Sequence, residues 1–156
     1  MNVEYINPFI EASQSVLLMM TGEKPELGKV HLRKAPFGSE NIAVIVGLTG
    51  KIRGQVVISF TIDSALAVAS AMMGGMTVTE LDDISKSAIS ELANMIMGNT
   101  ATILASRDIG IEITPPSLLM GERLMISPAN MQTISIPLVI RNDKRIEIDV
   151  SLENKK

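Results

Sequence analysis

The sequence predicts an α+β fold in which an antiparallel sheet carries long helices packed on one face. Two apolar runs, residues 42–48 and 52–60, flank the short segment Thr-Gly-Lys and are typical of a β-hairpin. Residues 133–140 and 145–152 form a second pair of this kind around a polar turn. Between residues 80 and 105, apolar side chains recur at the spacing of an amphipathic helix. Helices that accompany antiparallel hairpins pack as a layer on their sheet.

The chain begins with a predicted helix over residues 3–20, which is regular after Pro8. Residues 28–35 have the weaker pattern of a strand. Residues 36–41 contain Pro, Gly, Ser and Asn, and we expect a turn there before the first hairpin.

Two helices are predicted between the hairpins. Thr61 or Asp63 can cap a short helix over residues 64–73, and the pair Gly74-Gly75 would end it. The long helix over residues 80–105 has an Asp-Asp pair near its start, where the helix dipole favours negative charge.

The last part of the chain contains short strand candidates at residues 111–113 and 124–127, ahead of the second hairpin. Only residues 153–156 are expected to fray. No linker divides the chain, and its length favours one domain over residues 1–156.

Composition limits the classes of function. The 14 basic and 17 acidic residues include no basic stripe interleaved with aromatics, so nucleic-acid binding is not expected. Cysteine is absent, which excludes disulfides, cysteine nucleophiles and cysteine metal sites. No apolar run reaches the ~18 residues of a membrane span, and the N-terminus lacks the basic segment of a signal peptide. We therefore expect a soluble cytoplasmic protein that does not bind membranes.

The common catalytic and metal-binding arrangements are not found in the sequence. The only histidine, His31, lies in a polar strand candidate and is expected to be a surface residue. Residues 47–51 resemble a phosphate-binding loop superficially, but the segment is too short and joins two strands. No carboxylates and histidines cluster as ligands, so we expect no metal site and no cofactor belonging to this chain.

The main candidate site is a polar pair, Glu91 and Asn94, within the long apolar helix. At ~100° per residue, the pair shares one helix face with Ser87 and Gly98. Asn is a poor helix former, and a glycine inside a helix costs about 1 kcal/mol, so helix formation explains neither residue. Small flanking residues would leave the pair accessible to a large partner. The opposite face should contact the core with Ile89, Ala93, Ile96, Thr100 and Ile103.

Two observations bear on whether the Glu-x-x-Asn pattern indicates a functional site. A solvated polar face is the simpler interpretation, because Glu-x-x-Asn also arises by chance. A second copy, Glu4 to Asn7, is followed directly by Pro8, which disfavours helical geometry at Asn7. We expect Asn7 to act as a helix cap, so that Glu4 and Asn7 do not share a helical face and the copy has no catalytic role.

The segments around the pair resemble the CheC/CheX/FliY family of chemotaxis phosphatases, most closely its CheX members. The resemblance spans essentially the whole chain, and it implies a CheC/CheX-like fold. CheC-like members carry two Glu-x-x-Asn helices, whereas this chain resembles CheX members in having one good copy. The resembling segments are, in order, INPFIEAS, GLTGKIRGQVVISF, the MMGG helix end, SAISELANMIMGN and ITPPS.

The resemblance implies a phosphatase that acts on the aspartyl-phosphate of a CheY-like response regulator. By motif match, Asn94 would orient the attacking water, and Glu91 would pair with a lysine of the receiver domain. Ser87 and Gly98 would belong to the partner-binding face. The Mg²⁺ ion would belong to the regulator. A homodimer through sheet edges is also implied, and residues 133–140 are a candidate edge.

Two other functions stay open. A non-catalytic flagellar-switch or adaptor module on the same fold is the first alternative, and a small-molecule sensor domain is the second. The presence of both Glu91 and Asn94 favours the phosphatase.

Overall fold

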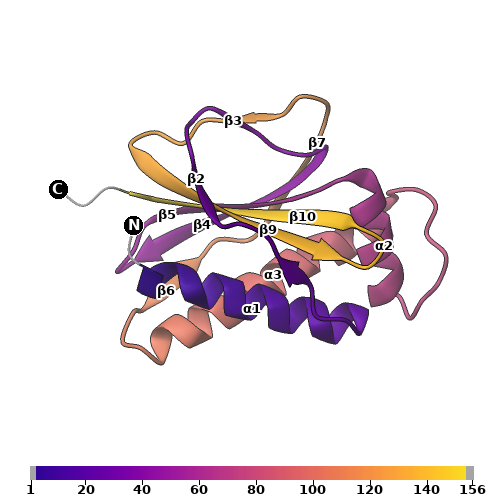
Figure 1. The fold of residues 1–156 in the computed structure, drawn as a ribbon, viewed down its shortest axis with the longest axis horizontal. Helices are drawn as coiled ribbons and strands as arrows, with labels where there is room; N and C mark the ends of the chain where they lie inside the picture. The colour runs from indigo at the N-terminus through magenta and orange to yellow at the C-terminus, as the bar shows by residue number, and fades with distance from the viewer. Residues whose placement is uncertain (1–2, 154–156) are drawn as a thin grey trace.

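The two predicted hairpins form the centre of one antiparallel sheet (Figure 1). The computed structural model describes residues 3–153. The first hairpin consists of β4 (Ile42–Gly50) and β5 (Gly54–Phe60), and the second of β9 (Met131–Ile140) and β10 (Lys144–Glu153). Because β5 pairs with β10, the central order is β9-β10-β5-β4. The predicted α+β class with an antiparallel sheet is confirmed.

Each outer strand of this centre is covered by short strands from the other half of the chain. β1 (Glu26–Leu27) and β2 (His31–Arg33) pair with β9, where the prediction had one strand over residues 28–35. The prediction that residues 133–140 form a free pairing edge is therefore wrong, because β2 covers residues 133–135 and β1 covers residues 138–139.

At the opposite side of the sheet, β6 (Ile111–Ile113) and β7 (Ser117–Met120) both pair with β4. The strand at residues 111–113 matches its prediction, whereas the pattern did not indicate β7. Between them, Thr114 bonds with Gly47 through both its backbone and its hydroxyl, at 3.0 and 2.8 Å. This contact holds the connection between the two short strands against β4.

Three helices complete the fold: α1 (Val3–Thr21), α2 (Ile62–Met72) and α3 (Asp83–Ala105). The long helices α1 and α3 lie on one face of the sheet, as predicted, and α2 lies at its end (Figure 1). Of the two predicted candidates for the cap of α2, Thr61 is the one that accepts a hydrogen bond from the backbone of Ser64. Asp82, predicted only as a favourable charge near the start of the long helix, is its cap and accepts a hydrogen bond from the backbone of Ser85 at 2.8 Å. Asp82 thus sets the start of α3 three residues later than expected.

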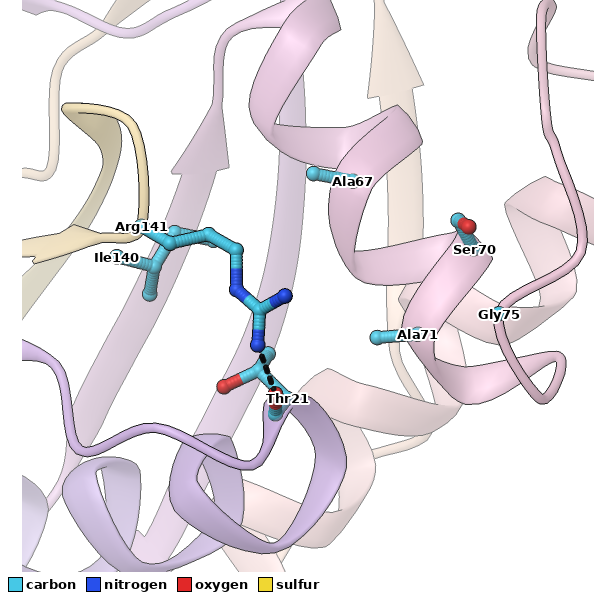
Figure 2. Close-up of a pocket in the computed structure, with 7 residues that line it drawn as sticks. All are labelled: Thr21, Ala67, Ser70, Ala71, Gly75, Ile140 and Arg141. Atoms are coloured by element: carbon cyan, nitrogen blue, oxygen red, sulfur yellow. Dashed lines mark hydrogen bonds between the residues drawn. The ribbon is translucent and has the colours of Figure 1, made fainter.

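The C-terminus of α1 is tied to the turn between β9 and β10. The guanidinium of Arg141 donates to the Thr21 carbonyl at 2.8 Å (Figure 2), which satisfies one of the carbonyl groups left unpaired at a helix end. Arg141 also forms an ion pair with Glu23 at 3.5 Å. At the other end of the helix layer, Arg107 follows α3 and lies 3.6 Å from Glu11 in α1.

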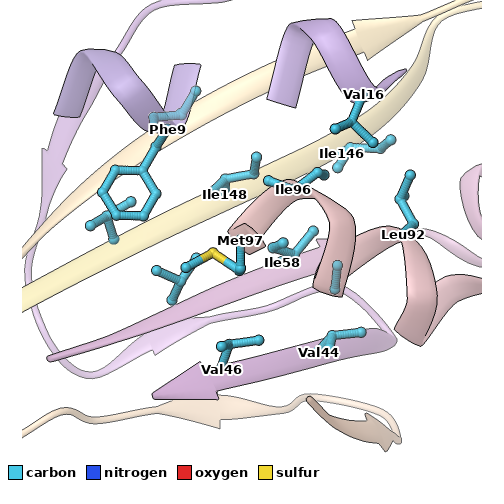
Figure 3. Packing of buried hydrophobic residues seen from close by; sticks show 14 of the residues in the cluster. Phe9, Val16, Val44, Val46, Ile58, Leu92, Ile96, Met97, Ile146 and Ile148 are labelled. Atoms are coloured by element: carbon cyan, nitrogen blue, oxygen red, sulfur yellow. The ribbon is translucent and has the colours of Figure 1, made fainter. Parts of the chain in front are cut away.

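The core lies between the helices and the sheet (Figure 3). Because strand side chains alternate between faces, every second residue of β4, β5 and β10 points toward the helices. Burying one such aliphatic side chain contributes about 1.5–3 kcal/mol. Together these contacts fix the rotation of α1 and α3 about their axes. The buried side chains include Phe9 and Val16 of α1, Leu92, Ile96 and Met97 of α3, and Val44, Val46, Ile58, Ile146 and Ile148 of the sheet.

The other face of the sheet carries a small second layer. β3 (Phe37–Gly38) pairs with β8 (Met125–Ile126), so the predicted turn at residues 36–41 contains a short strand. Phe37 and Ile126 pack there on Ala43 and Val57.

A charged cluster of one buried and two half-buried side chains lies beside this layer. Arg33 lies 3.0 Å from Glu147 and 3.3 Å from Asp149, whose side chain is fully buried. Burial, and secondly the neighbouring Glu147, raises the pKa of Asp149 to about 6. The Arg33 guanidinium also stacks 4.8 Å above the Phe37 ring, so it joins the second layer to the sheet.

Two of the sequence-based expectations concern the ends of the chain. Glu153 is the last residue of β10 and pairs with Met131, so the expected fraying does not begin there. Residues 154–156, and residues 1–2 of the expected domain, lie outside the described residues. Within residues 3–153, no helix combines the length and the apolar character needed to cross a membrane.

Candidate functional site

Helix α3 presents Glu91 and Asn94 on its outward face. Both side chains are exposed, as is Ser87 one turn earlier, while Gly98 is half-buried. The predicted helix face is therefore confirmed. Its opposite side faces the core as expected, except that Ile103 is half-buried and Leu104 takes the core position. The buried residues of α3 are Ser85, Ile89, Leu92, Ala93, Ile96, Met97, Thr100 and Leu104.

The polar groups of Glu91 and Asn94 are unused by the rest of the chain. Within residues 3–153, neither side chain has a hydrogen bond or an ion pair. The two residues are one helical turn apart, so a carboxylate and a carboxamide stand side by side on the surface. This arrangement can bind a cation and a water molecule that another molecule supplies.

Gly98 has no internal reason to be a glycine. It lies within α3 and is not among the glycines with positive φ. A Cβ atom added there would meet no atom of the chain within 4 Å. Since a helical glycine costs about 1 kcal/mol relative to alanine, the chain loses stability at Gly98 without a gain in packing. A close approach by another molecule would explain the residue.

The second Glu-x-x-Asn copy has a different geometry from the one predicted. Glu4, Asn7 and Pro8 all lie within α1, and the side chains of Glu4 and Asn7 are both exposed one turn apart. The expectation that Asn7 is a cap outside the helix is wrong. The burial of Ile6, Pro8 and Phe9 in the core outweighs the backbone hydrogen bond that a proline removes.

The two copies still differ in what surrounds them. Four residues after Asn94 stands Gly98, whereas four residues after Asn7 stands Glu11, which pairs with Arg107 at 3.6 Å. The α1 copy therefore has a charged side chain at the position where the α3 copy has a glycine, which has no side chain. This difference makes Asn7 a useful control for Asn94.

A cavity of about 260 Å³ lies between the C-terminal end of α1, α2 and the β9–β10 turn (Figure 2). Its charged group, Arg141, is already bonded to Thr21 and Glu23. None of the residues predicted for the site contributes to the cavity. Its lining consists of Thr21, Ala67, Ser70, Ala71, Gly75, Ile140 and Arg141.

The described residues contain no group of three His, Cys, Asp or Glu side chains that could hold a metal ion. His31 is exposed, as predicted, and its Nδ1 lies 2.8 Å from the carbonyl of Lys29. On the far face of the sheet, the half-buried Glu147 and the buried Asp149 are paired with Arg33. The exposed face of α3 is therefore the best candidate site.

Comparison with known proteins finds relatives that are similar over most of the chain. Residues 42–147, which include α3, match the family model "Chemotaxis phosphatase CheX". The CheY-P phosphatase CheX of Thermotoga maritima is 29% identical over 154 residues, covering 99% of both chains.

Two solved structures are similar over nearly the whole chain. The chemotaxis protein CheX from Desulfovibrio desulfuricans superposes with a TM-score of 0.86 at 29% identity, covering 96% of this chain and 99% of that one. A chain of the CheX-CheY-BeF3-Mg complex from Borrelia burgdorferi has a TM-score of 0.82 at 31% identity, covering 98% and 100%.

Proposed function

The chain belongs to the CheX family of chemotaxis phosphatases, and from this premise we propose that it hydrolyses the aspartyl-phosphate of a CheY-like receiver domain. The observation that carries the proposal is the pair Glu91 and Asn94, exposed on α3 and without a polar partner in residues 3–153. The relative from Borrelia burgdorferi, solved together with CheY, BeF3 and Mg, supports a receiver domain as the partner.

In the proposed reaction, Asn94 positions the attacking water. Its carboxamide can both donate to and accept from a water molecule, and it carries no charge that would repel the acyl phosphate. The water oxygen forms a bond to phosphorus while the bond from phosphorus to the aspartate oxygen breaks. Inorganic phosphate and the free aspartate carboxylate are the products, and the water protons pass to phosphate and solvent. Phosphoryl transfer depends mainly on positioning and charge stabilisation, so one well-placed amide can suffice.

Glu91 serves docking in this proposal. Its carboxylate, one turn before Asn94, pairs with a lysine of the receiver domain. The Mg²⁺ ion belongs to the receiver, and this chain supplies no ligand to it. Ser87 and Gly98 frame the pair with little side-chain bulk, which lets the receiver approach the helix backbone.

The proposal includes a homodimer and a cytoplasmic location. Since β1 and β2 cover the outer side of β9, pairing between two copies through a sheet edge would use β2 or the β6–β7 side in place of residues 133–140.

The test is the decay of a phosphorylated CheY-like receiver domain with the wild-type chain and with Asn94→Ala. We expect a rate lower by ~100-fold or more for the variant, because it loses the group that positions the water. Binding to a receiver loaded with BeF3 and Mg²⁺ should stay within a few fold, and circular dichroism should be unchanged. The control Asn7→Ala should leave the rate within a few fold.

The same assay separates the alternatives. A folded Asn94→Ala chain that hydrolyses at the wild-type rate would show that the pair is an ordinary solvated face. A wild-type chain that binds the loaded receiver without accelerating its decay would support the adaptor function.

A further inference from the structure

Helix α3 exposes one large apolar side chain in its first turn, Ile84. It is 65% exposed and is the only large exposed hydrophobic residue that the structure describes on α3. Ile84 precedes Glu91 by seven residues, so the two lie within about 20° of each other around the helix and ~10 Å apart along it. Ile84 therefore belongs to the same outward face as the candidate site.

The fold does not explain this isoleucine. Asp82 caps the helix, which puts Ile84 at the second helical position, where its side chain stays outside the core. A β-branched residue is a weaker helix former than alanine. A single exposed apolar residue is common on protein surfaces, so the inference depends on its alignment with Glu91 and on the charge around it.

The charge on this face has one sign. Glu91 is the charged residue of this face, and Asp83 lies beside it, about 100° around the helix from Ile84; both are exposed, and neither has an ion-pair partner in residues 3–153. The only basic residue of α3 is Lys86, which is half-buried and lies about 160° around the helix from Ile84. An apolar side chain that shares its face with one unpaired carboxylate and has a second beside that face is complementary to a surface that presents an apolar patch next to basic side chains.

We propose that Ile84 is an apolar anchor for the receiver domain, and that the docking surface extends two turns from Glu91 toward the start of α3. This inference rests on the proposed function, because the same receiver occupies the site. From Ile84 to Gly98 the surface is ~21 Å long. Interfaces of this kind concentrate their binding energy in a few buried apolar or aromatic residues.

The position of Ile84 separates its role from catalysis. It lies ~15 Å along the helix from Asn94, so it cannot touch the reacting phosphoryl group when Asn94 does. Ile84 should contribute to the affinity for the receiver and to KM, and kcat should not depend on it.

The test measures binding of Ile84→Ala to a CheY-like receiver loaded with BeF3 and Mg²⁺, together with the decay rate of the phosphorylated receiver over a range of concentrations. We expect Kd and KM to rise roughly 10-fold, equivalent to about 1.4 kcal/mol, with kcat within about twofold. Alanine is the better helix former, so the variant should fold. Ile62→Ala is the matched control, because Ile62 is also an exposed isoleucine at the start of a helix, α2, and it should change neither parameter.

The outcomes distinguish this inference from the proposed function. If Ile84→Ala binds as the wild type does while Asn94→Ala is inactive, the anchor is wrong and the phosphatase stands. A lower kcat at saturating receiver would also overturn the anchor. If Asn94→Ala is fully active, both proposals fail.

Discussion

Replacing Gly98 by alanine should stabilise the protein and at the same time impair its activity. The residue has helical backbone geometry, and an added Cβ atom would meet nothing within 4 Å. The fold should therefore gain the full difference in helix propensity, about 1 kcal/mol. For a chain of this size, that gain raises the melting temperature by roughly 2–4 °C.

Docking should change in the opposite direction. If the receiver contacts the helix backbone beside Asn94, a methyl group on Gly98 occupies space that the complex needs. Inserting a methyl group into a well-packed contact costs roughly 1–3 kcal/mol, which corresponds to a loss of roughly 5- to 150-fold in affinity. Opposite signs for stability and affinity are not expected from a residue that only serves the fold.

Thermal unfolding and binding to the loaded receiver measure the two effects on the same preparation. Gly110→Ala is the control for adding a methyl group elsewhere, because Gly110 also has open space around its Cβ position and lies outside α3. It should leave affinity and decay rate unchanged. A Gly98→Ala chain that is more stable and binds the receiver normally would refute the close approach. A less stable chain would show that the added methyl group clashes with neighbouring atoms of the fold.

Two further predictions concern charged residues. Glu91→Ala should weaken binding to the loaded receiver by ~2–5 kcal/mol, while circular dichroism stays unchanged; an affinity equal to that of the wild type would contradict the lysine pair. The raised pKa of Asp149, about 6, means that its contribution to stability is present below the unfolded value of 3.8 and is lost as the pH rises through 6. Asparagine cannot ionise, so the free energy of unfolding of Asp149→Asn, relative to the wild type, should increase by on the order of 3 kcal/mol between about pH 4 and pH 8. Urea denaturation measures this difference, and a value independent of pH would disprove the assignment.

The candidate site could be located from the sequence because its geometry depends on one helix. Helical spacing is local, so the order of apolar and polar residues between 80 and 105 determines which side chains point outward. Ser87, Glu91 and Asn94 are exposed as predicted, and Asp82 and Thr61 cap the helices that follow them. Ile103 lies at the margin of the buried face, where a small rotation of the helix decides its exposure.

The α1 copy shows where a local rule failed. Pro8 disfavours a helical conformation at Asn7, yet Asn7 is helical because its neighbours Ile6 and Phe9 are buried in the main core. The bias from a following proline acts on one residue, whereas burial of several apolar side chains acts on the whole helix. Only the packing of α1 could show that Glu4 and Asn7 stand side by side.

The sequence by itself determined the two hairpins, the helix caps and the polar face of α3, since each depends on residues within a few positions of one another. Only the tertiary structure decided that β1 and β2 cover β9, that Asp149 is buried beside Glu147 and Arg33, and that Ile84 is left uncovered in line with Glu91. These features arise from contacts between segments that are distant in the chain. Their energies depend on which surfaces meet after folding, so they cannot be predicted from the pattern of a short sequence segment.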